Sequence, residues 1–186
     1  MVVACHVTWG CYGFWLPNDP RGSGSRYVAN RDLYRFGPAT KVETRRSRAG
    51  VAHDVEARRR AKTTLKHEPL RLSGEMAQTV GVAIDGLGLR VYALAVLPDH
   101  VHAVLGRTEV RFEQQVRRMK QSATAALRRA DLVRADRPVW ARRGWFVFLN
   151  DDAAVGRAIR YVEANPVQAG LRPQRWSCVT PWQFTV

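Results

Sequence analysis

Two short apolar runs, separated by only three residues, constrain the fold of this chain more than any other feature. Residues 89–97 and 101–106 are dominated by Val, Leu and Ala, and Pro98-Asp99-His100 interrupts them. Apolar runs of this length, bounded by turn-forming residues, are typical of two adjacent antiparallel strands. The sequence therefore predicts a β-hairpin in the middle of the chain and a fold that is built around a sheet.

The rest of the pattern adds strands and helices on both sides of this hairpin. In residues 111–130, apolar side chains recur at steps of three and four, as they do on one face of an amphipathic helix. The predicted elements, in chain order, are a strand over 2–9, a helix over 74–86, the two hairpin strands, the helix over 111–130, a strand over 145–149 and a last helix that ends at Asn165, before Pro166. This order predicts an α+β fold, an antiparallel sheet with helices packed on one face.

A long segment without clear periodicity separates the first strand from the first helix. Residues 10–38 contain many Gly and Pro residues and predict a long loop, and residues 39–72 are rich in Arg. We interpret residues 18–72 as a long basic loop or insertion within a single domain that spans residues 1–186.

The charge of the chain indicates its kind of partner. There are 30 Lys and Arg residues against 16 Asp and Glu, a formal net charge of +14. Residues 40–72 hold ten basic and four acidic residues, and residues 107–143 hold eleven and four. Arg predominates, and its planar guanidinium donates two parallel hydrogen bonds to a phosphate. We therefore expect nucleic acid as a partner, before the alternative of two merely solvated helix faces.

Cysteine usage and hydropathy indicate the compartment. Three cysteines are an odd and sparse set, which argues against a disulfide scaffold. No apolar run approaches the roughly 18 residues of a membrane span, and a basic head followed by an apolar stretch, as in a secretory signal, is missing. We therefore expect a cytoplasmic protein without a membrane partner.

His100 and His102 stand two residues apart at the start of the second hairpin strand. Side chains at positions i and i+2 of a strand point to the same face of the sheet, so we expect the two imidazoles to lie side by side. Such a pair can provide half of a site for a divalent metal ion. The spacing is equally consistent with two partly exposed histidines on a solvated face.

The last predicted helix contributes a second polar pair. Tyr161 and Asn165 are four residues apart, so their side chains meet on one face of that helix. A lone tyrosine is usually a packing residue. Beside a histidine pair, however, the amide oxygen of Asn165 could be a third metal ligand, and the phenol of Tyr161 could attack a phosphorus atom.

The histidine pair and the tyrosine helix together resemble the single-tyrosine HUH transposases, and in particular the REP-associated tyrosine transposases and their insertion-sequence relatives. The resemblance is piecewise but extends along the chain. The segments that carry it are His6-Val7-Thr8-Trp9, Tyr12-Gly13-Phe14-Trp15-Leu16-Pro17, Leu97-Pro98-Asp99-His100-Val101-His102, Met119-Lys120-Gln121, Val139-Trp140 and Tyr161-Val162-Glu163-Ala164-Asn165-Pro166-Val167-Gln168-Ala169-Gly170-Leu171. The last segment, in register with the histidine pair, is the most specific.

This resemblance implies a ferredoxin-like sheet and a metal-dependent nuclease and strand-transfer enzyme that acts on single-stranded DNA, often folded into a hairpin. It implies that His100 and His102 bind Mg²⁺ or Mn²⁺ and that Asn165 completes the protein ligands. It also implies that Tyr161 attacks the scissile phosphate, which forms a 5′-phosphotyrosine link and frees a 3′-hydroxyl. Members of the family act as monomers or as homodimers, and both states stay open for this chain.

Other residues are candidates for supporting roles. Asp99 could orient an imidazole of the pair or be a turn residue, and His6 could lie under the site or be a structural histidine. The aromatic residues that could stack on unpaired bases, or pack under a loop, are Tyr12, Phe14 and Trp15. The residues expected to contact DNA phosphates are Lys120, Arg117, Arg118, Arg45, Arg46, Arg58 and Arg59.

Two other functions are compatible with the sequence. The chain could be a catalytically silent nucleic-acid-binding module, either a domesticated transposase or a regulator that binds RNA or DNA. It could also be a metal-dependent phosphodiesterase that uses water as the nucleophile. The segment 18–72 is longer and more Arg-rich than in compact members of the family. It could grip hairpin DNA or have no catalytic value.

Overall fold

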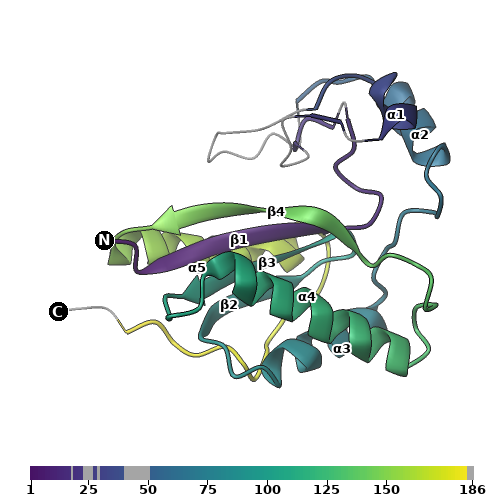
Figure 1. The fold of residues 1–186 in the computed structure, drawn as a ribbon. Helices are drawn as coiled ribbons and strands as arrows, with labels where there is room; N and C mark the ends of the chain where they lie inside the picture. The colour runs from purple at the N-terminus through teal and green to yellow at the C-terminus, as the bar shows by residue number, and fades with distance from the viewer. Residues whose placement is uncertain (18, 23–26, 29, 40–50, 184–186) are drawn as a thin grey trace.

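A four-stranded antiparallel sheet forms the centre of the computed structural model, which describes residues 1–17, 19–22, 27–28, 30–39 and 51–183 (Figure 1). The strands are β1 (Ala4–Cys11), β2 (Val91–Val96), β3 (His100–Gly106) and β4 (Trp140–Leu149), in the order β2-β3-β1-β4. The predicted α+β class and the predicted hairpin, which is β2 and β3, are confirmed. β4 begins at Trp140, earlier than predicted, because Trp140 pairs with Cys11 beyond an irregularity in the ladder.

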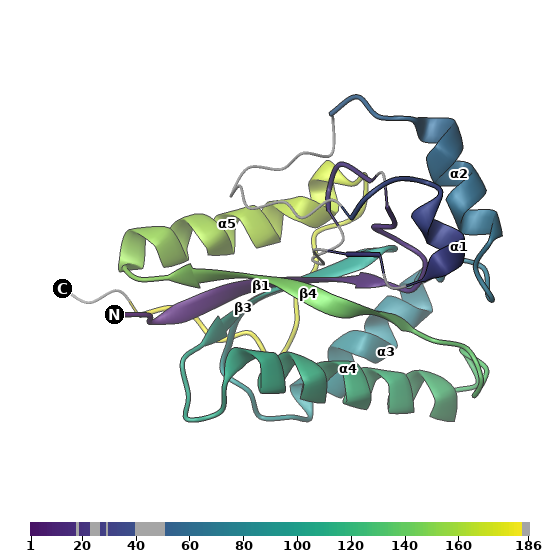
Figure 2. The ribbon, with the colours of Figure 1, turned by 45° about the horizontal axis from the view of Figure 1, so that its top comes forward.

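Helices cover both faces of this sheet. α3 (Gly74–Asp85) and α4 (Phe112–Arg129) lie on one face and α5 (Asp152–Gln168) lies on the other (Figure 2). The prediction of helices on one face therefore holds for α3 and α4 but is wrong for α5. The reason is that β1 and β3 are buried on both sides, and each apolar face of a sheet needs its own helical layer. No described helix combines the length and the apolar character that a membrane crossing would need.

Alternation along β1 divides the core between these two layers. Cys5, Val7 and Trp9 point toward α3 and α4, in a large cluster that includes Leu127 of α4. Ala4 belongs to a smaller cluster under α5, whose other buried members are Ala93, Ala95, Leu97, Val104, Leu149, Val155, Ala158 and Val162. The layer under α5 is therefore the smaller of the two, and the same face of β1 also carries His6 and Thr8.

The predicted end of the last helix at Asn165 is wrong, because α5 continues through Pro166 to Gln168. A proline in a helix removes one backbone hydrogen bond and disfavours the helical conformation of the preceding residue. Pro166 is buried and lies in the last turn, and its carbonyl accepts a hydrogen bond from the backbone N–H of Leu171 at 2.8 Å. The helix therefore continues past the proline, and Tyr161 and Asn165 both lie within it, one turn apart.

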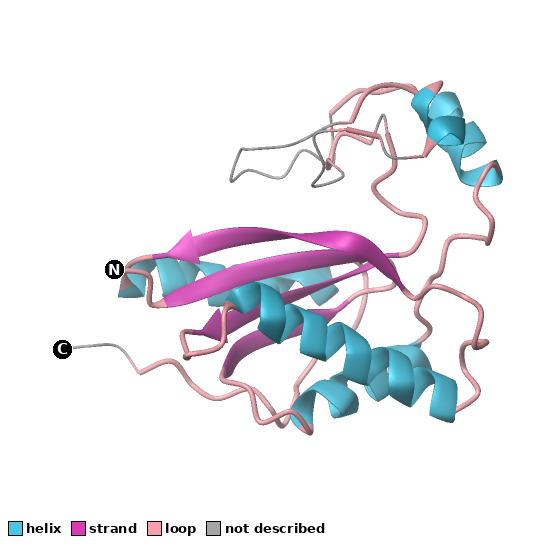
Figure 3. Ribbon diagram, viewed as in Figure 1, coloured by secondary structure: helices cyan, strands magenta, loops and turns pink. Residues whose placement is uncertain are grey.

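The segment between β1 and α3 contains two short helices where a loop was predicted (Figure 3). α1 spans Arg31–Tyr34 and α2 spans Val55–Thr63. Asp54 caps α2 by accepting a hydrogen bond from the backbone N–H of Ala57 at 2.8 Å, and Ala57 and Ala61 are its buried residues. Two alanines among arginines make an apolar stripe too weak to be read as a helix from the sequence.

The residues after α5 close the edge of the sheet at β2. The side-chain amide of Gln174 accepts a hydrogen bond from the backbone N–H of Val96 and donates one to its carbonyl, both at 2.8 Å. The backbone N–H of Thr180 donates to the carbonyl of Val91 at 2.9 Å. These bonds satisfy strand groups that an open edge would leave exposed.

Candidate functional site

The site is organised by the pairing of β1 with β3. Thr8 lies opposite His102, and Gly10 lies opposite His100. Because neighbouring strands in register present their paired side chains to the same face, His6, Thr8, His100 and His102 all project toward the α5 side of the sheet. As the spacing predicts, the two imidazoles of β3 are side by side, and their Nε2 atoms are 3.0 Å apart.

His102 is the buried member of this cluster, with an exposure of 5%. Its Nδ1 lies 2.8 Å from Oγ1 of Thr8 and 3.1 Å from Nε2 of His6. Burial lowers the pKa of His102 well below its ordinary value, and the neighbouring imidazoles of His100 and His6 lower it further. Burial also lowers the pKa of His6, to about 4. Both rings are therefore neutral at pH 7.

His100 is oriented by the residue that precedes it. Its Nδ1 is 2.6 Å from Oδ1 of Asp99. Burial by itself would raise the pKa of this carboxyl, but the hydrogen bond and charge of His100 and the guanidinium of Arg21 hold the pKa of Asp99 well below its usual range. A carboxylate only accepts hydrogen bonds, so the hydrogen on His100 is at Nδ1, and Nε2 faces His102.

The two facing Nε2 atoms share either one hydrogen or one cation, since two imidazole lone pairs at 3.0 Å would otherwise repel. The hydroxyl of Thr8 can donate or accept, so it is compatible with either tautomer of His102. Two ligands at right angles on an ion, each about 2.1 Å from it, lie about 3 Å apart. The pair therefore fits two positions around a divalent metal ion.

A third ligand would have to come from another residue type. The described part of the chain holds no group of three or more His, Cys, Asp or Glu side chains placed to bind a metal. Asn165, the predicted third ligand, donates from its amide nitrogen to the backbone carbonyl of Tyr161 at 2.8 Å. This bond uses the amide nitrogen and does not involve the amide oxygen, which is a suitable ligand type for Mg²⁺ or Mn²⁺.

Tyr161 lies directly beside the histidines. The centroid of its ring is 5.5 Å from that of His102 and 5.6 Å from that of His6, in edge-to-face arrangements. The residue is nevertheless 42% exposed, so it is not a fully packed core tyrosine. α5 thus brings a partly exposed tyrosine next to the imidazoles of His6 and His102, which a helix on the other face of the sheet could not do.

Trp15 forms a second wall of the site. Its ring centroid is 5.7 Å from that of His100, and a Cβ added at Gly10 would lie only 3.3 Å from the indole. The backbone of Trp15 has a φ of 56°, a left-handed conformation that few side chains adopt. Of the other aromatic candidates, Phe14 is buried and Tyr12 packs against the same core. Of the three, Trp15 is therefore the one that lies beside the histidines.

The predicted phosphate contacts are dispersed. Arg117 and Arg118 are exposed on α4, on the opposite face of the sheet from the histidines. The ammonium of Lys120 donates to the carbonyls of Ala141 and Arg143, at 2.9 and 3.4 Å, and burial lowers its pKa to about 8. Arg45 and Arg46 lie outside the described residues.

The two predicted contacts on α2 differ in their surroundings. Arg59 is 75% exposed and is 3.8 Å from the carboxylate of Glu56. Arg58 is only 27% exposed and is 3.9 Å from the carboxylate of Asp19. Arg58 therefore belongs to a network of charged groups that reaches the histidines.

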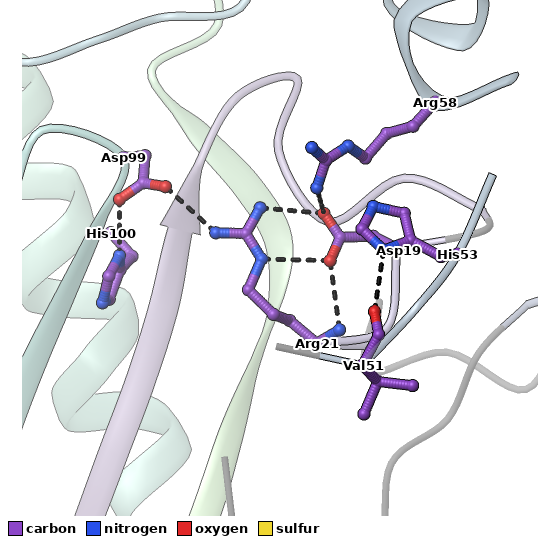
Figure 4. A network of polar contacts seen from close by, with 7 residues as sticks. All are labelled: Asp19, Arg21, Val51, His53, Arg58, Asp99 and His100. Atoms are coloured by element: carbon purple, nitrogen blue, oxygen red, sulfur yellow. Dashed lines mark hydrogen bonds and ion pairs between the residues drawn. The ribbon is translucent and has the colours of Figure 1, made fainter. Parts of the chain in front are cut away.

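That network contains two residues that the sequence did not single out, Asp19 and Arg21 (Figure 4). Arg21 donates from Nε and Nη2 to the two oxygens of Asp19, at 3.0 and 2.8 Å, and from Nη1 to Oδ2 of Asp99 at 3.1 Å. An Asp and an Arg two residues apart in a Pro-rich turn are a weak signal of such a pair. The contact with Asp99 has no local signal at all, because 78 residues separate the partners.

The structure of this chain matches two solved structures, in both cases at low sequence identity. One is a REP-associated tyrosine transposase bound to a REP hairpin, with a TM-score of 0.49 and 15% identity over 91% of this chain and 70% of the other. The second is a candidate transposase from Deinococcus radiodurans R1, with a TM-score of 0.39 and 13% identity over 88% of this chain and 90% of the other. No protein-family model and no curated protein matches the sequence.

Proposed function

We propose that the chain is a metal-dependent single-stranded DNA endonuclease and strand transferase with Tyr161 as its nucleophile. One observation carries the proposal. The Nε2 atoms of His100 and His102 converge at 3.0 Å, and the half-exposed ring of Tyr161 stands edge-on against His102. A nucleophile beside a pair of metal-binding imidazoles is the arrangement that metal-assisted attack on a phosphodiester needs.

The strand order supports the same proposal. β2-β3-β1-β4, with α3 and α4 on one face, is the order of a ferredoxin-like sheet, and β3 with its histidines is a central strand. This is the arrangement that the resemblance to HUH transposases implies. Tyr161 contacts His6 and His102 of its own chain, so the proposed nucleophile does not have to come from a second copy.

In this proposal His100, His102 and Asn165 hold Mg²⁺ or Mn²⁺. The metal would polarise the scissile phosphate and neutralise its developing charge. Asp99 keeps the hydrogen of His100 on Nδ1, so that Nε2 is available as a ligand. Thr8 and His6 hold the ring of His102 in place from the first strand.

Tyr161 carries out the bond exchange. Its phenolic oxygen bonds to the phosphorus as the bond from phosphorus to the 3′-oxygen breaks, the phenol loses its proton, and the 3′-oxygen gains one. The products are a 5′-phosphotyrosine and a free 3′-hydroxyl. The phosphotyrosine conserves the energy of the phosphodiester, so attack by a 3′-hydroxyl of another strand reverses the step and joins the two ends.

Covalent trapping tests this proposal. Wild-type protein is incubated with 5′- or 3′-labelled hairpin DNA carrying single-stranded flanks and Mn²⁺, and the products are separated on a denaturing protein gel. We expect an adduct only with the label 3′ of the cleavage point, and its complete loss in Tyr161→Phe. Tyr34→Phe is the matched control, because Tyr34 is 70% exposed on α1, and it should form the adduct at the wild-type rate.

Three other outcomes contradict the proposal. Cleavage that persists in Tyr161→Phe without an adduct would identify a phosphodiesterase that uses water. Binding without cleavage, with either Mg²⁺ or Mn²⁺, would identify a silent nucleic-acid-binding module. An adduct that survives Tyr161→Phe would place the nucleophile elsewhere.

A further inference from the structure

The guanidinium of Arg21 links the segment between β1 and α3 to the histidine pair (Figure 4). All three of its nitrogen atoms donate, two of them to Asp19 and the third to Oδ2 of Asp99. The other oxygen of Asp99 accepts from Nδ1 of His100 at 2.6 Å. The chain of contacts therefore runs without a gap from Asp19 to the proposed metal ligand.

We propose that Arg21 is a positioning residue for the metal site, which acts by holding Asp99 in the orientation that fixes the tautomer and ring of His100. This inference rests on the proposed function. It gives the segment 18–72 a role that the sequence did not suggest, since Asp19 and Arg21, near its start, hold Asp99 in place beside His100. Neither a DNA grip alone nor an insertion without catalytic value describes that turn.

The anchoring of Arg21 is what makes this geometry effective. Asp19 is 1% exposed, and it also accepts a hydrogen bond from the backbone N–H of Arg21 at 3.0 Å. Arg58 lies 3.9 Å from the same carboxylate. Because the carboxylate of Asp19 is buried and also bonded to the backbone of Arg21, the bidentate pair is held in place, and Arg21 offers Asp99 a donor at a defined point. The guanidinium carbon of Arg21 is also 6.0 Å from the centroid of the Trp15 ring. Asp19 and Trp15 therefore both restrain the side chain of Arg21.

The same contacts separate positioning from DNA binding. Each guanidinium nitrogen of Arg21 donates one N–H to a carboxylate, and the charges of Asp19 and Asp99 offset that of Arg21, so it attracts a phosphate less than a free arginine would. Its loss should therefore weaken metal binding and leave DNA affinity nearly unchanged, which is the opposite of what an exposed phosphate-binding arginine would do. Removal of a group that orients a metal ligand typically costs 10- to 100-fold in metal affinity.

Metal affinity gives the first test. We expect Arg21→Gln to weaken Mn²⁺ binding about tenfold by titration calorimetry, and Arg21→Lys to weaken it similarly, because an ammonium cannot make three donations in one plane. Arg134→Gln is the matched control. Arg134 makes the same two-bond pair with Asp136, two residues away, but both side chains are exposed and lie in the loop between α4 and β4. Unchanged or tighter binding by Arg21→Gln, or full affinity in Arg21→Lys, would overturn the inference.

A second readout needs no metal and no DNA. Long-range ¹H–¹⁵N spectra of the metal-free protein report which nitrogen of His100 carries the hydrogen. We expect the Nδ1–H tautomer in wild type and in Arg134→Gln, and a mixture of tautomers in folded Arg21→Gln. An unchanged tautomer in Arg21→Gln would refute the positioning role. If wild type bound no Mn²⁺ at all, the proposed function would fail, and this measurement would still decide the role of Arg21.

A double-mutant cycle identifies the route of the effect. If Arg21 acts through Asp99, the variant with both Arg21→Gln and Asp99→Asn should bind Mn²⁺ about as weakly as Asp99→Asn alone. Additive losses would show that Arg21 acts by a separate route and would contradict the inference. Cooperative thermal unfolding of each variant confirms that the comparison is made between folded proteins.

Discussion

The two faces of the sheet use the same strands for different purposes. On the face of α3 and α4, β1 contributes Cys5, Val7 and Trp9 to a large apolar core. On the face of α5, it contributes His6 and Thr8, which contact the buried imidazole of His102. The two sets alternate residue by residue, so a shift of one position separates the apolar interior from the polar site.

This difference shows how one sheet keeps an apolar core on one face and a cluster of polar side chains on the other. The apolar face has few polar groups to satisfy and can be packed to high density. The polar face has a smaller apolar cluster. The rest of this face holds three imidazoles and the hydroxyl of Thr8, and each of these groups has a hydrogen-bond partner. Because buried polar groups without partners are costly, this arrangement is possible only where several of them meet.

The largest effect should distinguish the two faces within one strand. His102→Ala should lower the rate of Mn²⁺-dependent cleavage on the order of 10³-fold, because a metal contributes several kcal/mol to the transition state. Val101→Ala, its neighbour on the apolar face, should lower the free energy of unfolding by about 2 kcal/mol and leave the rate per folded molecule nearly unchanged. Cleavage kinetics and urea unfolding of both variants make the comparison. A large loss of rate in folded Val101→Ala would show that the faces are not separable.

An intermediate effect should appear in the pH dependence of stability without metal. Above pH 6.5, His6 is neutral in both the folded and the unfolded chain and contributes nothing. As the pH falls below 6.5, the unfolded chain binds a proton that folded His6, with its pKa of about 4, does not bind, so stability decreases. We expect His6 to account for a loss of about 2 kcal/mol between pH 7 and pH 5.

Urea unfolding across this pH range measures that loss. The lowered pKa of His102 acts in the same direction. His6→Gln should therefore flatten the dependence without abolishing it. An unchanged slope in His6→Gln would mean that His6 is protonated as readily in the folded protein as in the unfolded chain.

The smallest effect concerns two exposed arginines, one on α2 and one on α4. Arg59 is exposed on α2, which is linked through Arg58 and Asp19 to the site, whereas Arg117 is on the far side of the sheet. We expect Arg59→Gln to weaken hairpin binding a few-fold and to reduce the slope of log affinity against log salt concentration by about 1, the value for one phosphate contact. Arg117→Gln should change both the affinity and the slope less. Fluorescence anisotropy at several salt concentrations measures both. An equal loss in Arg117→Gln would indicate DNA that wraps around both faces.

The sequence predicted the parts of the site that depend on short spacings. The interval between His100 and His102 follows from the two-residue period of a strand, and that between Tyr161 and Asn165 follows from the helical turn. The sequence misplaced the end of α5, because a proline is usually a helix stop and the last turn tolerates one. It also left α1 and α2 undetected, since their apolar stripes are short.

What the sequence determined by itself is therefore local: the hairpin, the alternation of buried and polar residues, and the shared face of each pair. Only the tertiary structure decided that α5 covers the histidine face, so that Tyr161 meets His102, and that Arg21 reaches Asp99. The physical reason is the range of the interactions. Strand and helix periods depend on residues that are neighbours in the sequence. The contact of His102 with Tyr161 joins residues 59 positions apart and that of Arg21 with Asp99 joins residues 78 positions apart, so both form only when the sheet and its helical layers assemble.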